Sequence, residues 1–262
     1  MKKKVTLFAD LWNEKGAVWR LFKNAMRAKT RFARASFLWN FIQPIVPLGF
    51  YILLSQINVF PQVDGMSRLT FVSIGVTLWL LFSGLIMVPM NGLEGALRDL
   101  SNARLSALSQ LFIRLNDLIF DTLVRVVFVT FILIFASEDS LEVNLLFIPF
   151  TILVMFLCFG LGIILGTFNL VMGDVGRVVT ILLQYGIFVS GVIFPISRLG
   201  ELGGYLALNP LFLAIQNLRS LIVSGGYELS LAALSWIGFG LLVFVWAFVV
   251  INILKDELKG RL

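Results

Sequence analysis

The sequence contains no histidine and only one cysteine, Cys158. Without histidine, the chain lacks the commonest general base and the commonest metal ligand of proteins. A single cysteine cannot form an internal disulfide. The chain also lacks the phosphate-binding pattern G-x-x-x-x-G-K-[ST] and the metal-binding patterns C-x-x-C and H-E-x-x-H. These absences predict a protein that is not an enzyme and that has no nucleotide, cofactor or metal site of its own.

Charged residues are also scarce. They make up 14% of the 262 residues, whereas apolar residues make up 59%. Typical soluble domains carry about 25% charged residues. This composition predicts an all-α integral membrane protein, because helices satisfy their own backbone hydrogen bonds within lipid.

Residues 1–35 predict a basic amphipathic helix rather than a membrane span. At helical spacing, Trp19 and Phe22 fall near one face, and Lys23 and Arg27 fall on the other. A helix of this kind lies in the membrane interface, with its basic face toward anionic headgroups. Two interpretations of it stay open, namely a membrane anchor only, or an anchor that also docks a cytosolic partner.

Six apolar segments follow, in a single transmembrane domain that we expect to cover residues 36–262. The predicted spans are 37–57, 69–90, 116–136, 144–166, 178–194 and 231–254. With the N-terminus inside, 17 of the 21 Lys and Arg residues fall on the cytoplasmic side, three fall outside and one lies within a span. Because positive residues concentrate on the cytoplasmic side of membrane proteins, this count predicts that both termini are cytoplasmic.

Two connections between the predicted spans are unusual. Residues 91–115 are polar but keep a helical pattern of leucines, which predicts a short cytoplasmic helix. Residues 195–225 stay apolar, although Pro195 breaks the fifth span and Asn209-Pro210 interrupts the segment that follows. These pieces are too short to cross the membrane and too apolar for a loop. We therefore expect a re-entrant segment that dips into the bilayer from outside.

Two features inside the spans each have two interpretations. In the third span, Asp121 and Arg125 lie one helical turn apart, in the favourable acid-before-base order. They form either a self-neutralising structural pair, which we favour, or part of a polar stripe that lines a passage. In the fourth span, Gly162 and Gly166 form a G-x-x-x-G pattern. This pattern permits close helix packing, either within one protomer or between two.

Four groups of residues occur in a recognisable order along nearly the whole chain. They are Arg31-Phe32, Leu38-Trp39 and Pro44; Gly75, Trp79 and Phe82; Asn169-Leu170, Asp174 and Arg177; and Phe194-Pro195, Tyr205 and Leu208-Asn209-Pro210. Together they resemble the membrane permeases of type-2 ATP-binding-cassette exporters, in the branch that exports capsule, O-antigen and teichoic-acid polysaccharides. The chain departs from the usual pattern of that branch at Ser106-Ala107, Phe112-Ile113 and Gly173-Asp174.

This resemblance implies a homodimer in the bacterial cytoplasmic (inner) membrane, driven by two copies of a separate ATPase subunit that binds ATP and Mg²⁺. The cargo would be a lipid-linked polysaccharide of the capsular or O-antigen type. The alternatives are an ATPase-coupled exporter of a small drug or lipid, a membrane assembly subunit that transports nothing, and a lipid or sugar transferase.

The resemblance also implies roles for individual residues. Arg31 and Arg34 would attract the phosphate of the lipid carrier at the inner opening, and Pro195, Asn209 and Pro210 would form an outer gate. Aromatic side chains suit the wall of a glycan passage, because their broad apolar faces lose little entropy when sugars contact them. The aromatic residues expected to line it are Trp39, Trp79, Phe82, Tyr185 and Phe188. The residues expected to couple the ATPase to the membrane domain are Lys23, Arg27, Glu94, Arg98, Asp99 and Arg104.

Overall fold

The computed structural model describes residues 7–31, 34–57, 66–98, 107–136, 144–193, 209–223, 235, 238–247 and 249–250. Every regular element in these ranges is an α-helix, which confirms the all-helical prediction. The helices are α1 (Leu7–Arg31), α2 (Arg34–Gln56), α3 (Arg68–Arg98), α4 (Ala107–Arg114), α5 (Asn116–Ala136), α6 (Phe147–Val171), α7 (Val175–Val189), α9 (Pro210–Val223) and a further helix at Gly238–Ala247.

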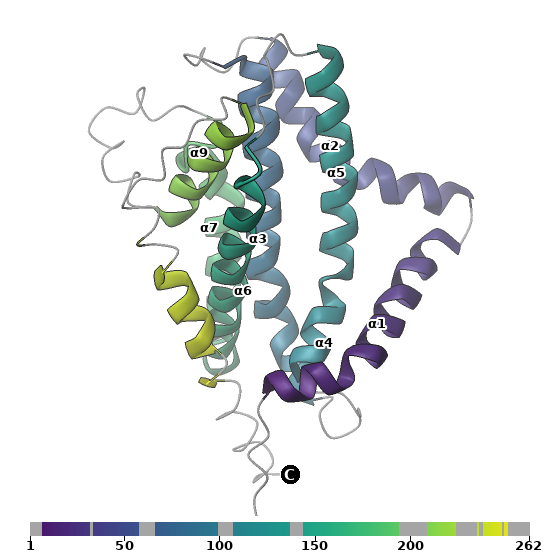
Figure 1. Cartoon of the computed structure of the whole chain (residues 1–262), viewed down its shortest axis with the longest axis vertical. Helices are drawn as coiled ribbons and strands as arrows, with labels where there is room; N and C mark the ends of the chain where they lie inside the picture. Colours follow the sequence, from purple (N-terminus) through teal and green to yellow (C-terminus); the bar gives the residue numbers. More distant parts are fainter. Residues whose placement is uncertain are drawn as a thin grey trace, which may run out of the picture.

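The long helix α3 lies at the centre of the fold (Figure 1). It contacts α2, α4, α5, α6, α7 and α9, and its most extensive contact is with α6. Its side chains Phe82, Met90 and Leu93 are almost completely buried. The amphipathic helix α1 and the short helix α4 lie together at the lower end of the bundle in this view.

The polar segment 91–115 is divided between two helices, in contrast to the single short helix expected from its leucine pattern. Its first residues continue α3 as far as Arg98, and α4 covers Ala107–Arg114. Leu93 accounts for the continuation, because its side chain is fully buried and packs beside Gly166 of α6. Packing of one apolar face stabilises helix more than the polar residues around it would by themselves.

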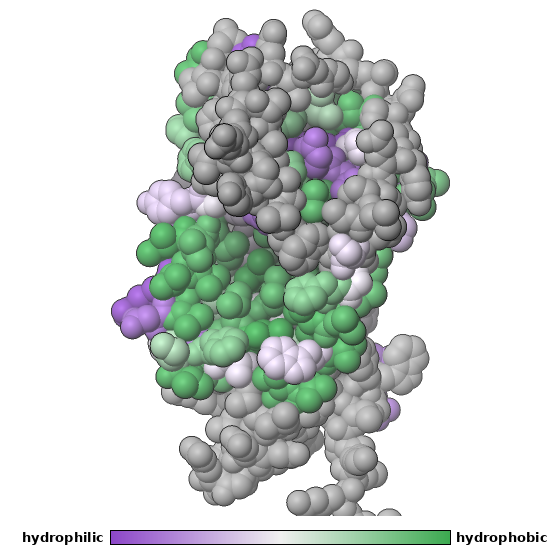
Figure 2. All heavy atoms as spheres, turned by 90° about the vertical axis from the view of Figure 1, so that its left-hand side faces the viewer, coloured by the Kyte–Doolittle hydropathy of each residue, from purple (hydrophilic) through white to green (hydrophobic). Residues whose placement is uncertain are grey.

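Two helices in the described part of the chain are long and apolar enough to cross a membrane, namely Arg68–Leu93 with 26 residues and Phe147–Val171 with 25 residues. The shorter apolar helices are Ile45–Leu54, Val175–Phe188, Leu211–Val223 and Gly238–Ala247. Viewed from one side, the described surface is largely apolar over the middle of the molecule (Figure 2). These features agree with a membrane-embedded bundle, whereas the six spans and the cytoplasmic placement of both termini stay predictions.

Glycines on α6 allow the two longest apolar helices to pack closely. A Cβ atom on Gly162 would overlap the backbone carbonyl of Ile86 and the ring of Pro89, both on α3. A Cβ atom on Gly166 would lie 3.1 Å from the carbonyl oxygen of Met90, also on α3. The G-x-x-x-G pattern of the fourth predicted span therefore packs within the protomer.

Replacing Gly162 by alanine should destabilise the fold by about 1–3 kcal/mol, because the added methyl group forces α3 and α6 apart. Thermal unfolding of the purified protein in detergent measures this. Gly49 on α2 provides the control, since nothing lies within 4 Å of a Cβ atom built there. Gly49→Ala should leave the melting temperature unchanged or raise it slightly. A Gly162→Ala protein as stable as the wild type would contradict the close packing.

Candidate functional site

The helix α7 is too short to cross a membrane. It has 15 residues, which corresponds to about 22 Å, whereas a hydrocarbon core is about 30 Å thick. After Val189 the chain turns through Ser190 and Gly191, and Gly191 has a positive φ of 63°. The last carbonyl groups of a helix have no partners within the helix. In a membrane-embedded bundle, other parts of the protein must supply them.

The helix α9, which lies in the segment predicted to be re-entrant, begins beside this turn. Asn209 caps it, because the backbone N–H of Leu211 donates to Asn209 Oδ1 at 3.0 Å. Asn209 Nδ2 also donates to Ser190 Oγ at 3.2 Å, which links the start of α9 to the end of α7. Pro210 occupies the first helical position, where its fixed φ favours the helix and its missing N–H is not needed. Of the three residues expected at the outer gate, Pro195 lies outside the described residues.

Arg219 on α9 is the most unusual residue of this region. Its side chain is only 2% exposed, although it carries a charge. Its Nη1 donates to the carbonyl oxygen of Gly191 at 2.9 Å, and its Nη2 donates to that of Val192 at 2.5 Å. The guanidinium carbon lies 3.6 Å from the centre of the Phe71 ring on α3. The charge of Arg219 is therefore compensated by the carbonyl groups after α7 and by an aromatic face.

Sequence reasoning missed Arg219 as a functional residue and counted it only among the basic residues outside the membrane. The signal that could have found it is its position inside the apolar run Leu211–Val223. An ionisable residue within an apolar segment of a membrane protein is by default a hypothesis for a functional site.

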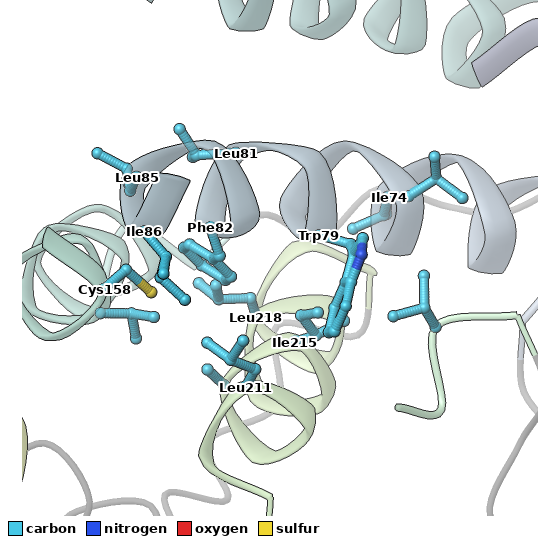
Figure 3. Close-up of a cluster of buried hydrophobic side chains, with 14 of the residues drawn as sticks. Ile74, Trp79, Leu81, Phe82, Leu85, Ile86, Cys158, Leu211, Ile215 and Leu218 are labelled. Atoms are coloured by element: carbon cyan, nitrogen blue, oxygen red, sulfur yellow. The ribbon is translucent and has the colours of Figure 1, made fainter. Parts of the chain in front are cut away.

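Two of the five aromatic residues expected to line a passage are buried inside this chain. Trp79 is 4% exposed and Phe82 is fully buried. Figure 3 shows both pointing from α3 toward Ile215 and Leu218 of α9. Trp79 Nε1 also donates to the carbonyl oxygen of Leu183 on α7 at 3.1 Å. These two side chains hold α3, α7 and α9 together in this structure, and the role in a passage stays a prediction for them.

The other three aromatic residues lie on the outside of the chain. Trp39 on α2 is 63% exposed, and Tyr185 and Phe188 on α7 are 60% and 43% exposed. The rings of Tyr51 on α2 and Phe188 on α7 meet edge to face, with their centroids 6.3 Å apart. Phe188 therefore joins α7 to α2 through the half-buried Tyr51, whereas Trp39 lies 12 residues before Tyr51 on α2.

At the other end of the bundle, α1 is attached to α4. Ser109 Oγ on α4 donates to Glu14 Oε2 on α1 at 2.5 Å. A cavity of about 320 Å³ between α1, α4 and α5 is lined by Lys15, Val18, Trp19, Phe22, Phe112 and Ile119. Lys23 and Arg27, two of the expected coupling residues, are exposed on α1. Both of these basic side chains therefore lie at the surface of α1.

The remaining predicted residues of the inner side are described only in part. Glu94 and Arg98 lie in the last turns of α3, and their side chains are outside the description. Arg31 is the last residue of α1 and Arg34 is the first residue of α2, so both lie at the corner between these helices. The side chains of these two arginines, and the residues Asp99 and Arg104 altogether, lie outside the described part.

The turn between α6 and α7 explains the third group of residues that carries the family resemblance. Asn169 Oδ1 accepts a hydrogen bond of 2.7 Å from the backbone N–H of Gly176, which fixes the start of α7. Arg177 forms an exposed ion pair with Asp174 at 3.1 Å. Such an exposed pair contributes little to stability. An open cavity of about 550 Å³ beside this turn is lined by Asn91, Asn169, Gly173, Gly176, Arg177, Thr180 and Ile181.

The charged pair of the third predicted span lies on α5. Arg125 is 8% exposed, and Asp121, which is partly buried one turn before it, acts on it electrostatically. An apolar cavity of about 320 Å³ opens nearby, between α3, α5, α6 and α9. Its walls include the threonines Thr77, Thr122, Thr130 and Thr151. Three of these, Thr77, Thr122 and Thr151, donate their hydroxyl hydrogen to the carbonyl four residues earlier on the same helix, so the cavity presents an apolar interior.

Comparison with known protein families identifies the family to which this chain belongs. The family profile described as "ABC-2 type transporter" matches residues 16–223. This range runs from residue 16, within α1, to the end of α9 at Val223. No curated protein matches the chain significantly. With most of its length matched, the chain belongs to the ABC-2 type transporter family and is a membrane component of such a transporter.

Proposed function

We propose that this chain is the transmembrane subunit of an exporter that moves a lipid-linked polysaccharide across the bacterial cytoplasmic membrane. Membership of the ABC-2 family implies ATP-driven export together with an ABC ATPase subunit. The proposal adds three points to this: the cargo is a glycan of the capsular or O-antigen type, the permease is a homodimer, and two copies of a separate ATPase supply the energy.

The observation that carries the choice of cargo is the exposure of three aromatic side chains on α2 and α7. Trp39, Tyr185 and Phe188 are exposed on helices that meet through the Tyr51–Phe188 contact. Rigid aromatic rings bury large apolar area at little entropic cost. They can hold successive sugar rings weakly and without preference for a sequence. A conduit for a long polymer needs such contacts, because the polymer must slide past them.

The inner end of the bundle offers a route for the energy of ATP hydrolysis. α1 is attached to α4 through the Ser109–Glu14 hydrogen bond, and α4 passes into α5 through the single residue Leu115. Movement of an ATPase that binds the exposed side chains Lys23 and Arg27 would therefore reach α4 and α5 together. Arg31 and Arg34, at the α1–α2 corner, would hold the phosphate of the lipid carrier.

A genetic experiment tests this function. Deleting the gene for this chain should leave lipid-linked glycan inside cells that synthesise it. The same deletion in a strain that cannot synthesise the glycan should show no transport phenotype. A phenotype that persists without glycan synthesis would contradict the polysaccharide assignment and favour a smaller cargo.

Replacing Tyr185 and Phe188 together by alanine should lower glycan export about tenfold, since two aromatic contacts contribute about 1–3 kcal/mol. Immunoblotting of surface glycan measures export, and co-purification shows that the ATPase still binds. Phe131 on α5 is a matched control, because it is 59% exposed, close to the 60% of Tyr185. An equal loss of export in Phe131→Ala would contradict a specific aromatic surface on α7.

The apolar cavity between α3, α5, α6 and α9 supports a second candidate function, export of a small drug or lipid. Its volume of about 320 Å³ lies at the lower end of the range for small-molecule sites, which is about 300–1,000 Å³. A bulky substitution such as Thr151→Phe would fill it. Loss of export of a hydrophobic dye in this variant, with glycan export intact, would favour the second function.

A further inference from the structure

We propose that Arg219 is a positioning residue for export, which fixes the re-entrant helix α9 against the end of α7. The lack of a side chain at Gly75 leaves space on α3 for the guanidinium of Arg219. The transport role of Arg219 rests on the proposed export function. Its role in holding α9 does not, and can be tested separately.

Arg219 and the turn after α7 each supply the hydrogen-bond partners that the other lacks. A buried guanidinium without a partner is strongly unfavourable. Carbonyl groups beyond the end of a short, membrane-embedded helix are also without partners. Arg219 donates to the carbonyls of Gly191 and Val192, so each group compensates the other. The negative end of the α7 dipole adds to the attraction.

Helix α3 also packs closely around the same guanidinium. Phe71 provides an aromatic face at 3.6 Å from the guanidinium carbon. One turn further along α3, a Cβ atom on Gly75 would overlap Arg219 Nη2 and would lie 2.9 Å from the carbonyl oxygen of Val192. Glycine weakens the interior of a helix relative to alanine. Close approach of the guanidinium is a physical reason for a glycine at this position.

Besides Arg219, hydrogen bonds at both ends of α9 hold it to its neighbours. The Asn209–Ser190 hydrogen bond ties its start to α7, and the backbone N–H of Asn144 donates to the carbonyl of Leu221 near its end at 2.8 Å. Arg219 is the only charged residue in the sequence of α9. It joins α9 to α7 and to α3 at a single point. Without it, the apolar face of α9 would be free to leave Trp79 and Phe82, and the outer wall of the bundle would open.

The experiment uses the full permease–ATPase complex with a reporter cysteine introduced by Ile215→Cys, at a position that is fully buried on the α3-facing side of α9. The background is Cys158→Ala, which removes the only native cysteine. Two quantities are measured for Arg219→Ala, Arg219→Lys, Gly75→Ala and the double variant Gly75→Ala/Arg219→Ala. One is the labelling rate of the reporter cysteine by a membrane-impermeant maleimide added from outside. The other is glycan exported per ATP hydrolysed by the assembled complex.

We expect Arg219→Ala and Gly75→Ala each to raise the labelling rate and to lower the export-to-hydrolysis ratio, by about tenfold or more. Arg219→Lys should keep part of both values, because an ammonium group can still donate to the carbonyls but loses the planar geometry of the guanidinium. The double variant should be only slightly worse than Arg219→Ala, since the methyl group added on α3 then has no guanidinium to displace and meets only the Val192 carbonyl oxygen, at 2.9 Å. Gly238→Ala is the control, with nothing within 4 Å of the added Cβ atom.

An unchanged labelling rate in Arg219→Ala would overturn the proposal. The proposal would also be overturned if the fold-changes of Gly75→Ala and Arg219→Ala multiplied in the double variant, because the effects of independent sites combine in that way. If the Arg219→Ala complex does not assemble, Gly75→Ala is the deciding variant. A wild-type labelling rate and a wild-type export-to-hydrolysis ratio in Gly75→Ala would then overturn the proposal. A residue needed only for folding would reduce the amount of complex but leave the ratio per assembled complex unchanged, which also overturns the transport role. If even the wild-type protein exports no glycan, the labelling rates still decide whether Arg219 holds α9, and only the proposed function fails.

Discussion

Replacing Arg31 and Arg34 together by alanine is expected to reduce glycan export by about 100-fold or more while the ATPase subunit stays bound. Hydrogen bonds to charged groups contribute about 1.5–3 kcal/mol each, and about 1.4 kcal/mol corresponds to a factor of ten. Both residues lie at the corner between α1 and α2, at the end of the amphipathic helix. A phosphate held there would be presented to α2 before the glycan enters the bundle.

Three measurements separate phosphate capture from other effects of this double variant. Accumulation of lipid-linked glycan in the cytoplasmic leaflet measures the loss of export, and co-purification measures ATPase binding. The double lysine variant is the matched control, because it keeps both charges but loses the planar, bidentate geometry of the guanidinium. It should retain partial export. Normal export by the double alanine variant would remove the assignment of these two arginines.

Replacing Trp79 by alanine is expected to destabilise the protein by about 3–5 kcal/mol, because it removes a large buried side chain from the contact between three helices. The indole is 4% exposed, it donates to the carbonyl oxygen of Leu183, and its ring lies about 3.1 Å from a Cβ atom built on Gly186. The melting temperature should fall by on the order of 10 °C. Trp79→Phe should lose only the hydrogen bond and part of the packing, about 1–2 kcal/mol.

This variant also separates a structural role of Trp79 from a role in lining a passage. A structural residue loses export only in proportion to the loss of folded protein. A lining residue loses export at normal stability, as expected for the exposed Tyr185. Unchanged stability of Trp79→Ala together with lost export would therefore show that the side chain faces the passage during transport.

The helices and their order could largely be predicted from the sequence. The uncharged apolar runs predicted α3 and α6, because only apolar side chains are favourable in lipid and in the core of the bundle. The amphipathic pattern predicted α1 in the same way. The extension of α3 to Arg98 was not predicted, since it depends on Leu93 packing beside Gly166 of another helix. A local pattern does not contain that contact.

The site was less predictable, for a related reason. Asn209 and Pro210 were found because a cap and a proline act locally, at the start of their own helix. The partners of Arg219 are backbone carbonyls 27 and 28 residues away. Backbone groups carry no sequence signature. Whether an aromatic side chain is buried or exposed could not be predicted, for another reason. Trp79 and Tyr185 are both amphipathic aromatic side chains in apolar segments, yet one is buried and the other exposed.

Transport by the purified complex in liposomes tests the central claim most directly. The permease and its ATPase are reconstituted together, and a fluorescent glycan linked to polyprenyl pyrophosphate is placed in the outer leaflet, on the side of the ATPase. We predict that the glycan reaches the lumen only when ATP and Mg²⁺ are present and both subunits are intact. Failure of the glycan to cross, while a small hydrophobic dye is moved at the expense of ATP, would contradict the account.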